Sequence, residues 1–78
     1  MNVIVKRIKL DTEHDNQKWI CLEGSISGFP QVTKRRSINT AALVDGSLTL
    51  AAEKARLVAD VEEYYARYLA VQSQLKEL

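Results

Sequence analysis

The sequence predicts an α+β fold, a three-stranded antiparallel meander followed by one long C-terminal amphipathic helix. Three observations point to this class. Residues 1–45 hold segments rich in β-branched side chains that are separated by turn signals, residues 48–78 contain no Gly or Pro, and apolar residues recur there at helical spacing. We therefore expect one small domain over residues 1–78, with the sheet and a connector in 1–45 and the helix in 48–78.

The first two strands follow from their composition and alternation. Residues 2–10 are rich in Val and Ile, and the polar run over 11–17 suits a loop. In the second strand, residues 18–27, alternation places one set of side chains toward the core. This set is Ile20, Leu22 and Ile26, and the opposite face carries Trp19, Cys21, Glu23 and Ser25.

The first strand breaks its own alternation, because Val3 and Val5 share one parity whereas Ile8 and Leu10 share the other. A bulge near Lys6-Arg7 would bring all four apolar side chains to one face. Without a bulge, one of the two pairs faces solvent or a partner.

A turn at Gly28-Phe29-Pro30 leads into the third strand, residues 31–39, which places Val32 and Ile38 on one face. Residues 40–44 then extend this strand or form a helical turn, and we favour a short connector. Asp45-Gly46 is a strong turn dipeptide in either case.

The long helix begins after a plausible N-cap, Ser47 or Thr49, and Glu53 suits the positive end of the helix dipole. A mostly apolar stripe along the helix repeats as a heptad over four repeats. The members of the stripe are Leu50, Lys54, Leu57, Val61, Tyr64, Tyr68, Val71, Leu75 and Leu78.

This helix is expected to be longer than the body that carries it. Its 31 residues would span roughly 45 Å, whereas a compact globule of this size is only roughly 30 Å across. The overhanging stripe then covers itself by self-association, belongs to a monomer with a frayed tail, or binds a different protein. We favour a homodimer through Tyr64, Tyr68, Val71, Leu75 and Leu78.

The composition excludes several classes of protein. The net charge of +1 names no ligand, and no stretch approaches the ~20 apolar residues of a membrane span. A single cysteine, Cys21, cannot form an internal disulfide, and charges at Lys6, Arg7 and Lys9 interrupt any signal peptide. We expect a reduced, cytoplasmic protein.

Basic residues on two strands give an alternative function, a small nucleic-acid-binding regulator, or a site for an acidic protein. If the strand order is 1-2-3, the basic clusters flank the middle strand and can share a face with a stacking Trp ring. Charges on edge strands also serve simply to block aggregation. The residues concerned are Lys6, Arg7, Lys9, Trp19, Lys34, Arg35 and Arg36.

The sequence offers little for catalysis, so we expect a non-catalytic protein-interaction module of the adaptor or inhibitor type. His14 lies in an acidic run that matches no metal-binding spacing, and Cys21 has no neighbour that would activate its thiol. Glu62 and Glu63 point about 100° apart on a helix. We expect no cofactor, no metal and no small-molecule substrate.

Overall fold

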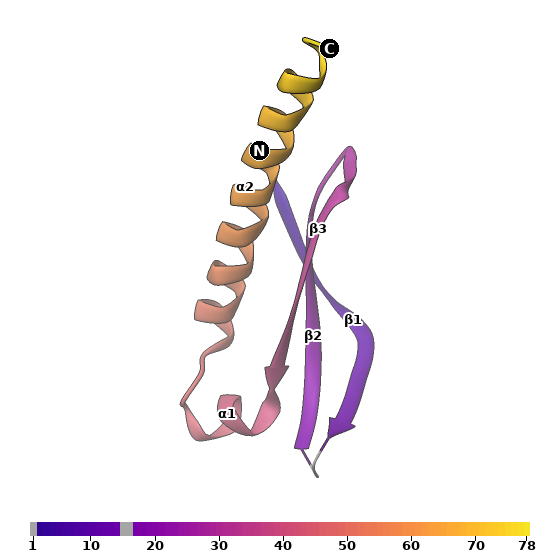
Figure 1. The fold of residues 1–78 in the computed structure, drawn as a ribbon. Helices are drawn as coiled ribbons and strands as arrows, with labels where there is room; N and C mark the ends of the chain where they lie inside the picture. The colour runs from indigo at the N-terminus through magenta and orange to yellow at the C-terminus, as the bar shows by residue number, and fades with distance from the viewer. Residues whose placement is uncertain (1, 15–16) are drawn as a thin grey trace.

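The fold is known from a computed structural model that describes residues 2–14 and 17–78, except for the side chains of residues 9–14 and 17. Three antiparallel strands, in the order β1-β2-β3, form one sheet, and two helices follow (Figure 1). The elements are β1 (Val3–His14), β2 (Gln17–Ile26), β3 (Phe29–Asn39), α1 (Thr40–Asp45) and α2 (Leu50–Leu75). The predicted fold class is confirmed.

The strands are longer than their sequence patterns suggest. Strand β1 continues to His14 and β2 begins at Gln17, so most of the polar run predicted as a loop is strand. Strand β3 begins at Phe29, inside the predicted turn, where Gly28 takes a positive φ of 85°. Backbone pairing with a neighbouring strand overrides polar composition here, because each ladder position satisfies main-chain donors and acceptors.

Of the two alternatives for the first strand, the one without a bulge at Lys6-Arg7 is correct, because pairing is regular there and the register shifts between Ile8 and Thr12. As a result Val3 and Val5 pack against the core, whereas Ile4 and Ile8 lie on the opposite face of the sheet. The side chain of Leu10 lies outside the described residues.

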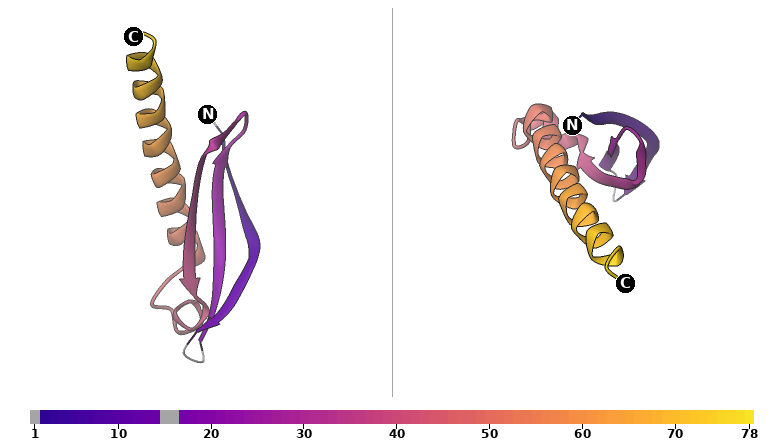
Figure 2. Two further views of the ribbon diagram at one scale, coloured as in Figure 1. Left: turned by 45° about the vertical axis from the view of Figure 1, so that its right-hand side comes forward. Right: turned by 90° about the horizontal axis from the view of Figure 1, so that it is seen from above.

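One face of the sheet forms the core with α2. Leu22, Ile26, Val32 and Ile38 are buried against Leu57 and Val61, as the predicted strand faces require. Seen from above, α2 lies on one side of a curved sheet and leaves the other side uncovered (Figure 2). We call the uncovered side, which carries Trp19, Cys21, Glu23 and Ser25 of β2, the outer face.

The connector is helical. Asn39 caps α1 by accepting a hydrogen bond from the Ala41 amide, and Gly46 ends it at a positive φ of 86°. Of the two N-cap candidates, Thr49 caps α2: its hydroxyl accepts from the Ala52 amide at 3.2 Å. The helix therefore starts two residues later than predicted and ends at Leu75.

The premise that the body is a compact globule is wrong, although the overhang that followed from it is present. The molecule measures 51 × 20 × 18 Å because the long strands run beside the helix. Helix α2 nevertheless passes the β2–β3 turn, and its last turns stand clear of the sheet (Figures 1 and 2).

Candidate functional site

The first half of α2 is fixed on the sheet by apolar packing. Leu57 and Val61 are fully buried. Gly24 on β2 permits this close approach, because a Cβ at that position would lie 2.8 Å from Val61 Cγ2. The sheet therefore covers the stripe at Leu57 and Val61, whereas Leu50 and Lys54, predicted members of the stripe at its start, are exposed.

A buried charge fixes the first turn of α2 to β3. Glu53 is only 1% exposed, and its carboxylate accepts a charged hydrogen bond from Arg36. Arg56, one turn further along the helix, approaches the other carboxylate oxygen at 3.4 Å. Since a buried carboxylate needs charged or hydrogen-bonding partners, this contact sets where the helix sits on the sheet.

The tyrosines form the transition between the covered and uncovered parts of the helix. Tyr65 and Tyr68 make edge contacts with Phe29, with ring centroids 5.0 and 6.1 Å apart. Tyr68 also accepts a hydrogen bond from Gln31, and the Lys34 ammonium lies 4.6 Å from the Tyr64 ring centroid. Tyr68 therefore contacts its own sheet on one side and remains partly exposed.

Beyond Tyr68 the predicted interface residues lie on the surface. Val71 and Leu75 are 48% and 53% exposed, and Leu78 is fully exposed. We call Tyr64, Tyr68, Val71, Leu75 and Leu78 the distal stripe. Tyr64 and Tyr68 still contact β3, whereas Val71, Leu75 and Leu78 are exposed beyond it.

A groove between β3 and α2 leads into the distal stripe. It is lined by Lys34, Asp60, Glu63, Tyr64, Arg67, Tyr68 and Val71. Arg67 bonds Glu63 at 2.6 Å across one helical turn, so part of its charge is satisfied within the chain. Of the four charged lining residues, Lys34 was predicted only as part of the basic set. Asp60, Glu63 and Arg67 were not predicted as site residues, although they recur at the three- and four-residue spacing of one helix side.

Leu69, which is 45% exposed, is also an exposed apolar residue that the heptad pattern missed, because it lies off the stripe. The anchoring role of Phe29 was missed for a different reason. Its Gly-Phe-Pro setting indicates only a turn, and nothing local links it to tyrosines far along the chain.

The basic residues do not form one patch. Strand order 1-2-3 is as the alternative requires, but alternation puts Lys34 and Arg36 on the helix-covered face, and Arg7 pairs there with Leu22. Only Lys6 and Arg35 share the outer face with Trp19. The shared face expected for the whole set is wrong, and the Lys9 side chain lies outside the described residues.

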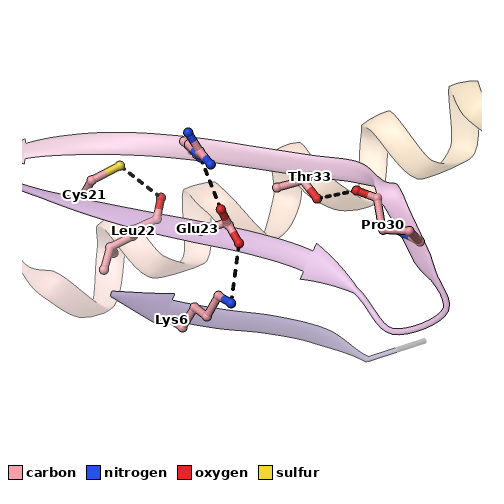
Figure 3. A network of polar contacts seen from close by, with 7 residues as sticks. Lys6, Cys21, Leu22, Glu23, Pro30 and Thr33 are labelled. Atoms are coloured by element: carbon pink, nitrogen blue, oxygen red, sulfur yellow. Dashed lines mark hydrogen bonds and ion pairs between the residues drawn. The ribbon is translucent and has the colours of Figure 1, made fainter. Parts of the chain in front are cut away.

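On the outer face, the two remaining basic side chains flank an acidic one. Glu23 lies 3.7 Å from the Lys6 ammonium and 3.2 Å from Arg35 Nε (Figure 3). Trp19 is half-buried and four residues away along β2, or about 13 Å. This cross-strand triad carries a net charge of +1, because the single carboxylate offsets one of the two cations.

The residues considered for catalysis are dispersed. Cys21 is buried, consistent with a packed thiol, and Glu62 and Glu63 are both exposed. The His14 side chain lies outside the described residues. Among the residues that the structure does describe, no group of three or more acidic, His or Cys side chains could hold a metal ion.

No protein-family model, curated protein or solved structure matches this chain. Across residues 2–14 and 17–78, neither helix has the apolar length needed to cross a bilayer.

Proposed function

We propose that this protein is a non-catalytic protein-interaction module, of the small adaptor or inhibitor type, that forms a homodimer through the distal stripe. The observation that carries the proposal is the exposure of Val71, Leu75 and Leu78 on the same heptad that buries Leu57 and Val61 lower down. An apolar stripe that continues past its own sheet is typical of a helix with a packing partner.

The available apolar surface favours a weak, reversible dimer. Val71 and Leu75 are about half exposed, so covering each contributes about 1 kcal/mol, and Leu78 contributes roughly twice that. Two copies together give about 8 kcal/mol, against an association cost of about 4–15 kcal/mol. With the smallest of these costs about 4 kcal/mol remains, so a dissociation constant of about 1 mM is expected.

Analytical ultracentrifugation from about 10 μM to about 1 mM tests the proposal. The weight-average mass should rise from 8.8 kDa toward twice that value. In the double variant Val71→Asp/Leu75→Asp the rise should disappear while the far-UV strand signal is retained, because two desolvated carboxylates face each other across the seam.

The matched control is Ala66→Asp/Ser73→Asp, which adds the same charge to exposed positions on the opposite side of the same helix. This control should dimerise like the unchanged chain. The proposal is contradicted if the unchanged chain keeps the monomer mass at every concentration. It is also contradicted if the two double variants reduce the mass by the same amount.

The alternative of nucleic-acid binding has less support, because the basic side chains are divided between two faces and Glu23 lies between Lys6 and Arg35.

A further inference from the structure

The sheet that packs on α2 limits how the helices of two copies can be oriented relative to each other. Resting on the self-association proposed above, we infer that two copies pair their distal helices antiparallel, with Val71 of each copy against Leu75 of the other. The two sheets then lie at opposite ends of the assembly.

A parallel pair is excluded by the chain's own sheet. Packed helices lie about 8–10 Å apart, so a second helix on the stripe side of α2 needs the layer next to it. From Leu57 to Tyr68 that layer holds β2 and β3 (Figure 1). A parallel second helix starts at the same level and would pass through the sheet, whereas an antiparallel one runs away from it beyond the β2–β3 turn.

The register follows from the stripe and from the position of the sheet. Because α2 ends at Leu75, this pairing makes the two helices overlap over residues 71–75, about 7 Å, and the turn that follows brings Leu78 to the level of Tyr68 of the other copy. The next register of the heptad, with a longer overlap, would bring Leu78 of the second copy to the level of Val61, which is fully covered by its own sheet. The register centred on Ser73 is thus the deepest that the sheet permits.

The side chains beside the seam suit a second copy of this chain. Gln72 and Gln74 flank the Val71 and Leu75 positions, and a two-fold axis brings identical flanking side chains together. A glutamine amide both donates and accepts, so two copies can bond without the repulsion that like charges would cause. No unmatched charge at the seam calls for a differently charged partner.

Cysteine cross-linking in a Cys21→Ala background tests the direction. Disulfides should form faster in an equimolar mixture of Val71→Cys and Leu75→Cys chains than in either variant alone, by about tenfold. In a parallel pair each variant would face itself, so each would cross-link alone at least as fast as the mixture, and this result would overturn the inference while leaving the dimer intact.

A distance measurement gives an independent readout that does not alter the seam. Ala55 is exposed, and spin labels attached there through Ala55→Cys in the same background should lie about 54 Å apart in the antiparallel dimer. A parallel pair would bring them within about 20 Å. Absence of any dimer in ultracentrifugation would instead refute the proposed function itself, so the two failures are distinguishable.

Discussion

The buried ion pair between Glu53 and Arg36 yields the sharpest prediction about stability. Arg36→Met keeps most of the aliphatic stem but removes the guanidinium, which leaves Glu53, with a side chain 2% exposed, without its closest cation. Breaking a buried pair in this way costs about 3–5 kcal/mol. Because the Arg36 side chain is 34% exposed and Arg56 remains at 3.4 Å, we expect about 2–3 kcal/mol.

That loss is large for a chain of 78 residues, whose free energy of unfolding is expected to be about 4–12 kcal/mol. Urea unfolding followed by circular dichroism, at one fixed protein concentration, should show the midpoint lowered by about 2 M with an unchanged slope.

Two companion variants separate the buried pair from general charge effects. Arg56→Met removes a partner that is 63% exposed and should cost less than about 1 kcal/mol. Arg36→Met/Glu53→Leu removes both members of the pair and should be more stable than Arg36→Met alone, because no isolated buried charge is left. If the two arginine variants lose equal stability, or the double variant is the weakest of the three, the reasoning about Glu53 is refuted.

Three further predictions concern the sheet and the connector. Gly24→Ala should destabilise the fold by about 1–3 kcal/mol in urea unfolding, because the new methyl group would meet Val61 at 2.8 Å; a loss below about 0.5 kcal/mol would mean that α2 lies further from the sheet. Lys6→Gln/Arg35→Gln should lower heparin retention no more than Lys54→Gln/Lys76→Gln, which removes the same charge from exposed positions of α2 and its C-cap, because Glu23 offsets one of the two strand charges. A markedly greater loss in the strand variant would support the nucleic-acid alternative. Hydrogen bonds from Ser47 lower the pKa of Asp45 from its ordinary value of 3.8, so the ionised carboxylate stabilises the fold. Asp45→Asn should therefore lower the melting temperature slightly at neutral pH, and this difference should vanish as the pH falls through the lowered pKa of Asp45. A difference that grows in acid would contradict the prediction.

Much of the fold could be predicted because its signals are local. Alternation identified Leu22, Ile26, Val32 and Ile38 as core residues, and all four are buried. Helical spacing and a hydroxyl cap placed α2 to within two residues at its start. The candidate site was partly accessible for the same reason, since Val71 and Leu75 continue a visible repeat.

The predictions that the structure corrected depend on contacts between residues that are far apart in the sequence. The first strand breaks its alternation, but only the pairing with β2 places the register shift after Ile8. Glu53 is a plausible helix-dipole residue in the sequence, yet its main partner is Arg36, seventeen positions earlier. The basic run is continuous in sequence, and alternation divides its side chains between two faces, but only the packing of α2 decides which face is covered.

Three strands, a long amphipathic helix and an apolar stripe longer than the core of one domain can be inferred from the order of residues alone, because periodicity and capping act within a few residues. How far the sheet reaches along α2 cannot be inferred in this way. That reach separates Val61, which is buried, from Val71, which is not. It depends on strand length, register and the close approach at Gly24, which are properties of the packed chain as a whole.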